Sequence, residues 1–175
     1  KSFVNIFYIF KDAFKNVPFR KLCIATFLVF NSFQTIAAFS FFIIVHYLFM
    51  GDASAASPWP TLHGSVGAIV TTFLVIPLVS KMAQIYGKKE TFIISQSISV
   101  IGYILFWFLF IPGKPYMFLF ALPFFSFGIG GLFTLMMSMT ADACDFEELQ
   151  NGLPRKEGSF GAIYWWMVKL GTALA

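Results

Sequence analysis

The sequence predicts an all-α integral membrane protein, and three observations support this prediction. Hydrophobic residues make up 58% of the 175 residues and charged residues only 11%, whereas about 25% of a typical soluble domain is charged. Several apolar runs are long enough to cross about 30 Å of hydrocarbon as helices. The Lys and Arg residues gather in alternate connections between these runs. A soluble enzyme domain, a disordered region and a nucleic-acid binder are therefore disfavoured.

The segment 1–21 precedes the first run and is too charged to cross a bilayer. It carries phenylalanines at helical spacing and polar residues on the opposite side. These are Phe3, Phe7, Phe10 and Phe14, against Lys11, Asp12, Lys15 and Asn16. The pattern predicts an amphipathic helix along the cytoplasmic membrane face, with Pro18 marking the turn into the first span. A simple cytoplasmic linker is the alternative interpretation.

The segment 22–175 is predicted to form one transmembrane helical bundle. We expect spans at 22–49, 64–80, 91–111, 116–140 and 159–175. The first four contain no Asp, Glu, Lys or Arg. The fifth is shorter than the about 20 residues that a crossing helix needs. Because the chain begins at Lys1 and stops within this last run, we expect it to be a fragment of a longer protein.

The basic residues predict the orientation, because cytoplasmic connections near span ends collect Lys and Arg. They cluster before the first span, after the second and before the fifth, whereas the opposite connections hold only Lys114. The N-terminal end and the connections 81–90 and 141–158 are thus expected on the cytoplasmic side of the plasma membrane. The net charge of +4 is then a consequence of topology, and we expect no nucleic acid partner.

Lys169 is the only charged residue within the expected spans. It lies about 15 Å along the helix axis from Ser159, near the bilayer midplane. An ammonium there is costly unless it is paired, hydrated or facing the bundle interior. Lys169 either lines a substrate or ion pathway or forms a structural ion pair. The nearby Tyr164, Trp165 and Trp166 either stack against a sugar ring or belong to the interfacial aromatic belt.

Five of the eight acidic residues lie in the connection 141–158, and four of them are gathered at its start: Asp142, Asp145, Glu147 and Glu148. Asp142 and Asp145 are three residues apart, so they share a helical face. These carboxylates form a conformational gate with basic groups, bind magnesium for diphosphate chemistry, or simply solvate the connection. Metal binding is the least favoured, because the chain holds no second acidic cluster, and we predict no metal site.

Two spans carry small or polar residues that favour close helix contacts. The first span has a stripe of Asn31, Gln34, Thr35 and Ala38, which either packs helices through hydrogen bonds or faces water. The fourth has Gly128, Gly130 and Gly131. These glycines do not form a dinucleotide fingerprint, and they favour a close helix approach or a bend.

Several motifs resemble the glycoside–pentoside–hexuronide:cation symporters, which are relatives of melibiose permease in the major facilitator superfamily. The motifs are Asn16-Val17-Pro18-Phe19, Tyr86-Gly87-Lys88-Lys89, Ala141-Asp142-Ala143-Cys144-Asp145-Phe146-Glu147-Glu148, Arg155-Lys156-Glu157-Gly158 and Val168-Lys169-Leu170-Gly171. The acidic motif together with the intramembrane lysine is the most specific part. The resemblance covers nearly the whole chain.

The resemblance implies a C-terminal half of a twelve-helix transporter that carries a sugar or glycoside together with sodium or a proton by alternating access. It places Lys169, with Trp165 and Tyr164, in the central cavity, and we add Asn31 and Gln34 to this expected substrate pathway. It assigns Asp142 and Asp145 to a cytoplasmic gate, to which we add Arg155. Gly87, Lys88 and Lys89 form a loop motif of the superfamily.

The resemblance also implies that the coupling-ion site belongs to the N-terminal half, so we expect no cofactor or metal in this chain. The expected partners are a small-molecule sugar, the lipid bilayer and the N-terminal half of the same transporter, and we expect no enzymatic activity. Two alternatives remain. One is an intramembrane prenyl-transfer-type enzyme that uses Asp142, Asp145 and Glu148 for magnesium diphosphate. The other is a lysolipid-type transporter of the same family.

Overall fold

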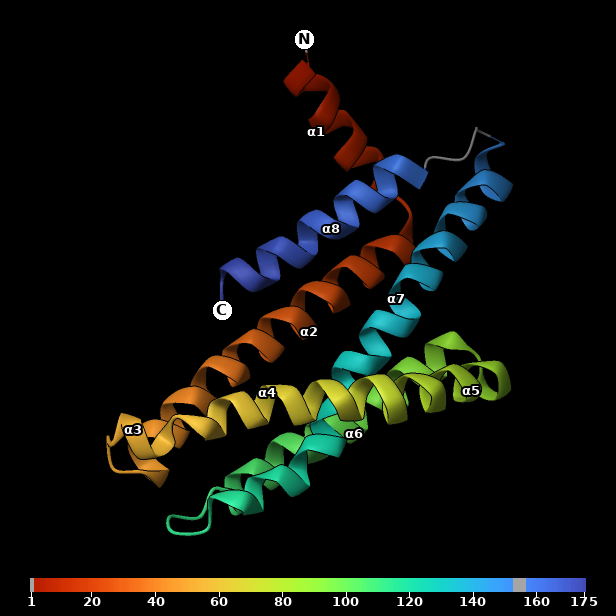
Figure 1. Ribbon diagram of the computed structural model, residues 1–175. Coiled ribbons are helices and arrows are strands. Elements are labelled where there is room, and N and C mark those ends of the chain that lie inside the picture. The colour runs from red at the N-terminus through yellow and green to blue at the C-terminus, as the bar shows by residue number, and fades with distance from the viewer. Residues whose placement is uncertain (1, 153–156) are drawn as a thin grey trace. The chain divides into compact units, whose positions relative to one another are not determined.

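The computed structural model describes residues 2–152 and 157–175, and over these residues it is helical and contains no strand (Figure 1). The chain divides into two compact units. Unit 1 contains Lys1–Gln34 and Met136–Ala175, and unit 2 contains Thr35–Leu135. Two long helices, α2 (Val17–Phe42) and α7 (Leu122–Asn151), each contribute residues to both units. The predicted all-α fold is confirmed.

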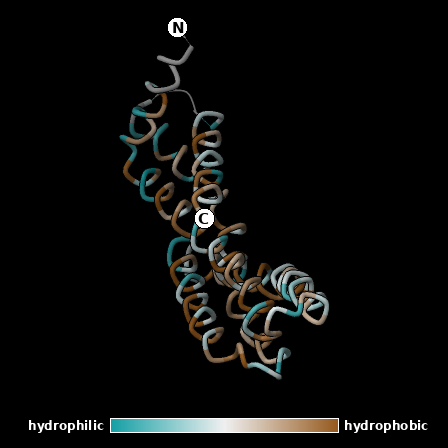
Figure 2. The backbone as a smooth tube through the Cα atoms, turned by 90° about the vertical axis from the view of Figure 1, so that its left-hand side faces the viewer, coloured by the Kyte–Doolittle hydropathy of each residue, from teal (hydrophilic) through white to brown (hydrophobic). Residues whose placement is uncertain are grey.

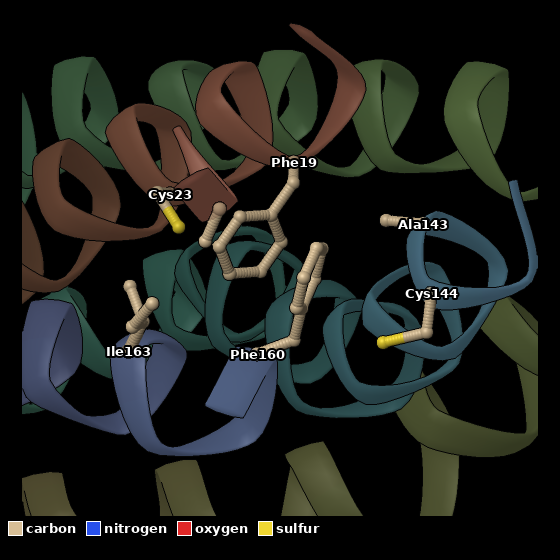
Figure 3. Packing of buried hydrophobic residues seen from close by; sticks show 7 residues of the cluster. Phe19, Cys23, Ala143, Cys144, Phe160 and Ile163 are labelled. Carbon is tan, nitrogen blue, oxygen red and sulfur yellow. The ribbon is translucent and has the colours of Figure 1, made fainter. Parts of the chain in front are cut away.

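Unit 1 consists of α1 (Ser2–Ala13), the first part of α2, the last part of α7 and α8 (Glu157–Ala173). Its apolar core joins all four helices. The buried members are Ala13, Phe19, Cys23, Ala143, Cys144, Phe160 and Ile163. Figure 3 shows the Phe19 and Phe160 rings turned toward each other, with centroids 4.2 Å apart. Burial of these side chains holds α8 against α2 and α7.

The aromatic face of α1 packs against α8. Phe10 stacks on Phe14 and makes a T-shaped contact with Trp166. The side chains of Phe3 and Phe7 lie outside the described residues. Part of the predicted amphipathic face is therefore used for helix packing. The placement of Asn16 on the opposite, solvated side was wrong, because this side chain is 4% exposed and caps α2 from within the unit.

Unit 2 holds the remaining helices around the first part of α7. They are η1 (Ile43–Leu48), α3 (Ala53–Ala56), α4 (Pro58–Val70), η2 (Thr71–Val75), α5 (Ile76–Tyr86), α6 (Lys88–Leu109) and η3 (Pro115–Ala121). Two of these, η1 and η2, are π-helical. Pro77, just inside α5, lacks the N–H that a regular helix needs, which accounts for the irregular turn at η2.

The predicted close approach of the α7 glycines is confirmed. A Cβ added at Gly131 would lie 2.6 Å from the Ser95 Cβ of α6, and one added at Gly130 would lie 2.6 Å from the Val75 Cγ1 of η2. A Cβ at Gly128 would overlap Ser99. The glycines thus let α7 contact α6 and η2 at the same time.

The connections are shorter than predicted, because helical structure continues beyond the apolar runs. Residues 58–63 belong to α4, where Pro58 fits the first turn. Only Gly87, with φ of 85°, separates α5 from α6. Within the predicted connection 141–158, residues 141–151 are helical and form the last turns of α7. Backbone hydrogen bonds sustain a helix outside lipid, especially through good helix formers such as Glu and Leu.

Asp52 is the last residue of the short connection between η1 and α3, and it is the N-cap of α3. Its Oδ1 accepts hydrogen bonds from the Ser54 hydroxyl at 2.6 Å, the Ser54 N–H at 3.0 Å and the Ala55 N–H at 3.1 Å. The Ser54 hydroxyl, followed by the two N–H groups, holds the pKa of Asp52 below its ordinary value. The charged form is therefore the one that caps α3.

Four helical segments have the length and composition of membrane spans: Val17–Leu48, Ala53–Tyr86, Lys88–Leu109 and Pro115–Gln150. Figure 2 shows hydrophobic residues along much of the helical backbone. Large apolar side chains lie on the outside, and Trp107, for example, is 84% exposed. This is the surface that a lipid environment covers. The fifth predicted span corresponds to α8, which has 17 residues.

Candidate functional site

The two faces of α8 carry different residues. The buried face consists of Phe160, Ile163, Tyr164, Val168 and Gly171. Lys169 is exposed on the other side, and Trp165, one helical turn before it, is 46% exposed. Residues four apart share a helix face, so the ammonium and the indole lie on one surface. Their predicted role in a substrate pathway stays a prediction.

Tyr164 points into unit 1 instead. It is 3% exposed and lies beside Cys23 and Thr26 of α2. The Thr26 hydroxyl donates to the Leu22 carbonyl at 2.8 Å and contacts the Met136 sulfur at 3.2 Å. In this structure Tyr164 therefore serves the packing of α8 on α2 and does not share the Lys169 surface.

The polar stripe of α2 divides in the same way. The Asn31 Nδ2 donates to the Gly171 carbonyl of α8 at 3.3 Å, and a Cβ at Gly171 would lie only 2.8 Å from the Phe27 carbonyl oxygen. Asn31 thus joins two closely spaced helices. Gln34 is exposed, so it is the member of the predicted pathway pair that faces outward from unit 1.

The predicted gate residues lie on the last turns of α7. Asp142 and Asp145 are both exposed, and their spacing on a helix places them on one side of it. Arg155, the predicted basic member of the gate, lies outside the described residues. Residues 141–151 of α7 hold four acidic side chains, and its last turn holds no basic residue. Negative charge is therefore concentrated near this end, and for Glu148, in the last turn, the helix dipole is also negative. This end of α7 therefore favours a cationic partner.

A junction that the sequence pattern does not predict lies beside the gate residues. The Asn16 Oδ1 accepts from the Phe19 N–H at 3.0 Å, which is the hydrogen bond of an N-cap. The Asn16 Nδ2 donates to the Ala143 carbonyl at 3.2 Å and to the Glu147 Oε2 at 3.0 Å. The side-chain amide of Asn16 thus caps the start of α2 and links it to α7 by hydrogen bonds. The Asn-x-Pro sequence indicates the cap, but no local signal indicates a partner 131 positions away.

The predicted loop motif forms the turn between α5 and α6. Gly87 has φ of 85° and ψ of 160°, a conformation that favours glycine. Lys88 and Lys89 occupy the first turn of α6. The Lys89 Nζ lies 3.8 Å from the Glu90 Oε1, and both side chains are exposed, so this ion pair contributes little stability.

Unit 2 contains an apolar cavity of about 650 Å³ between the end of α2, η1 and α6. Its lining is mainly aromatic, with Phe39, Tyr47, Tyr103, Phe106 and Trp107 among its residues. Within residues 2–152 and 157–175, no group of three or more His, Cys, Asp or Glu side chains has metal-binding geometry. His63 packs among the rings of Phe106, Phe118 and Phe125.

Comparisons with known proteins point to one family. The family model described as "MFS/sugar transport protein" matches residues 1–175. The curated "Glucuronide carrier protein homolog" of Escherichia coli (strain K12) is 29% identical over 160 residues, which cover 91% of this chain and 33% of that protein. The chain therefore spans about a third of the length of this relative. No solved structure matches the chain.

Proposed function

The chain belongs to the MFS/sugar transport family, and from this membership we propose that it is part of a secondary active transporter that moves a sugar or glycoside by alternating access. The family match over the whole chain carries the proposal. Membership and the four span-length helices make the chain part of a multi-pass protein of the plasma membrane. It is a transporter component and not an enzyme, which removes the prenyl-transfer alternative.

The cargo that we propose is a glycoside with a negatively charged sugar, such as a hexuronide. The similar protein from Escherichia coli is named a glucuronide carrier homolog, and a glucuronide carries a carboxylate. Lys169 and Trp165 supply an ammonium and an indole on one face of α8. The ammonium pairs with the carboxylate, and the indole stacks on the sugar ring. Gln34 and Asn31 remain proposed pathway residues on α2.

Uptake by the full-length transporter in proteoliposomes tests this cargo. We expect a labelled hexuronide to enter the vesicles and an excess of unlabelled hexuronide to block its entry, whereas a lysolipid does not compete. Competition by the lysolipid alone would favour the lysolipid-type transporter and contradict the proposal. A neutral glycoside of equal size is the matched competitor, because it differs only in the carboxylate.

We propose that sodium or a proton drives this uptake and that the ion binds outside this chain. The described residues of the predicted spans present no acidic side chain that would neutralise a cation in the hydrocarbon layer. An imposed sodium gradient and an imposed pH gradient, applied separately to the same vesicles, distinguish the two ions. Equal uptake with and without both gradients would indicate facilitated diffusion.

The acidic end of α7 is proposed to act as the cytoplasmic gate, with Arg155 as a member. Neutralising Asp142→Asn and Asp145→Asn together is expected to reduce the maximal uptake rate about threefold to tenfold, because exposed ion pairs contribute modest energies. The apparent substrate affinity should not change. Glu90→Gln, at the start of α6, is a matched control for removing exposed negative charge. If the double variant transports at the same rate as this control, neither Asp142 nor Asp145 has a role in the gate.

A further inference from the structure

We propose that Asn16 is a positioning residue that clamps the start of α2 to the end of α7 and sets how readily this end of unit 1 opens during transport. The inference rests on the proposed transport function and assigns a regulatory contact within it. The clamp consists of Asn16, Glu147 and the Ala143 carbonyl. Asn16 and the Ala143 carbonyl belong neither to the predicted substrate pathway nor to the predicted gate, whereas Glu147 is one of the carboxylates of the acidic end of α7.

The hydrogen-bonding capacity of the Asn16 side chain matches its surroundings. The amide oxygen accepts from the Phe19 N–H, and the amide nitrogen donates to two acceptors of α7. An amide is required, because it offers an acceptor and two donors in one group. A carboxylate or a hydroxyl at this position caps α2 equally well, but a carboxylate has no donor for the Glu147 carboxylate. The two roles of Asn16 can therefore be separated by mutation.

The clamp covers the apolar core of unit 1. Three members of that core adjoin Asn16. Ala13 and Phe19 are each three residues away along the chain, and the Ala143 carbonyl accepts a hydrogen bond from the Asn16 amide. Cys144, next to Ala143, is 2% exposed. Its thiol becomes accessible when the ends of α2 and α7 separate. The reactivity of Cys144 thus reports the state of the clamp.

The forces at this junction oppose each other. The last turns of α7 hold Asp142, Asp145, Glu147 and Glu148, and like charges three residues apart on one helix, such as Asp142 and Asp145, repel each other. The Asn16 amide donates to one of these carboxylates and to a backbone carbonyl, and such bonds are strong where water is excluded. A junction stabilised by a few short contacts against repulsion is suited to open and close reversibly.

The test uses the full-length transporter in proteoliposomes with three changes: Asn16→Asp, Asn16→Ser, and the double change Asn16→Asp with Glu147→Gln. Modification of Cys144 by N-ethylmaleimide is followed by peptide mass spectrometry, alongside uptake and thermal stability. Asn16→Asp keeps the cap and replaces the amide–carboxylate bond by repulsion, so we expect Cys144 to react about tenfold faster. The maximal uptake rate should change while the apparent KM stays constant.

The double change restores a donor across the junction, because the new amide at position 147 faces the new carboxylate at position 16. We expect Cys144 reactivity to return to within about threefold of the wild type. Asn16→Ser keeps the capping oxygen and replaces the two amide donors by the single donor of a shorter hydroxyl, so Cys144 should again react faster than in the wild type, without an added charge. It provides the same comparison if Asn16→Asp does not fold.

Two results would overturn the proposal. In the first, Cys144 of both single variants reacts at the wild-type rate per folded molecule, and uptake falls only as much as the amount of folded protein does. The other is a double variant as reactive as Asn16→Asp. If the wild type transports no glycoside but the reactivity pattern holds, the proposed function fails while the clamp is supported, because the labelling requires no sugar.

Discussion

Replacing Gly102 by alanine is expected to prevent stable folding of unit 2. A Cβ at this position of α6 would lie 2.5 Å from the Phe125 nitrogen and 2.9 Å from the Phe124 carbonyl carbon of α7. Both are backbone atoms, which no rotamer change can move away. Overpacking by side-chain contacts alone costs about 1–3 kcal/mol, and displacement of two helix backbones costs more, so we expect a loss of at least about 3 kcal/mol.

Small side chains continue the contact along α6. Thr91, Ser95 and Ser99 are buried residues of α6, as Gly102 is, and α7 meets Ser99 and Ser95 with glycines at 128 and 131. Helices in membranes associate through such small-residue surfaces, because lipid supplies no hydrophobic driving force between them. The crossing of α6 and α7 therefore depends on the absence of side-chain volume at these positions.

Thermal unfolding of the full-length transporter in detergent measures this effect. Gly64→Ala in α4 is the matched control, because nothing lies within 4 Å of its added Cβ. Alanine is the better helix former by about 1 kcal/mol, so the control should be neutral or stabilising. Equal melting temperatures for Gly102→Ala and Gly64→Ala would show that the close contact does not limit stability.

Replacing Lys169 by alanine is expected to lower hexuronide uptake about tenfold to a hundredfold. The change removes a charge-assisted hydrogen bond to the proposed carboxylate, worth about 1.5–3 kcal/mol, and each 1.4 kcal/mol corresponds to about tenfold. Because Lys169 is exposed on α8 and contributes no buried side chain to the core of unit 1, folding should be retained. Uptake across a series of sugars, with expression as a reference, measures the effect.

The matched control is Lys114→Ala, which removes an exposed lysine from the turn before η3. Lys169→Arg keeps the charge and should retain part of the uptake. A neutral glycoside, where it is carried at all, should lose less from Lys169→Ala than a hexuronide does. If Lys169→Ala takes up every candidate sugar at the wild-type rate, Lys169 has no role in the transport mechanism.

The fold class and the approximate spans could be predicted from the sequence, because hydropathy over about 20 residues shows whether a helix is suited to lipid or to water. The ends of the helices could not. At residues 141–151 the polarity indicates departure from lipid, yet backbone hydrogen bonding continues the helix. At Gly87 a single residue of positive φ is sufficient for the turn, whereas the polarity of residues 81–90 predicts a longer connection.

The candidate site was predicted only in part, for a physical reason. Lys169 stands out because a charge in an apolar helix is rare, and the α7 glycines stand out because they lack side chains. Tyr164 and Trp165 are adjacent and equally aromatic, so only the packing of α8 shows that one is buried and the other exposed. The partners of Asn16 lie on a distant helix, and the polarity of asparagine alone suggested a solvated position.

Counterflow in proteoliposomes that contain the full-length transporter tests the central claim most directly, because it needs no ion gradient and detects carrier-mediated exchange. Vesicles preloaded with an unlabelled hexuronide are diluted into a trace of the labelled compound. We predict a transient accumulation of label above equilibrium, which is lost in vesicles loaded with a lysolipid instead. A monotonic approach to equilibrium, identical to that of protein-free vesicles for every sugar tried, would contradict the assignment of this chain to a sugar transporter.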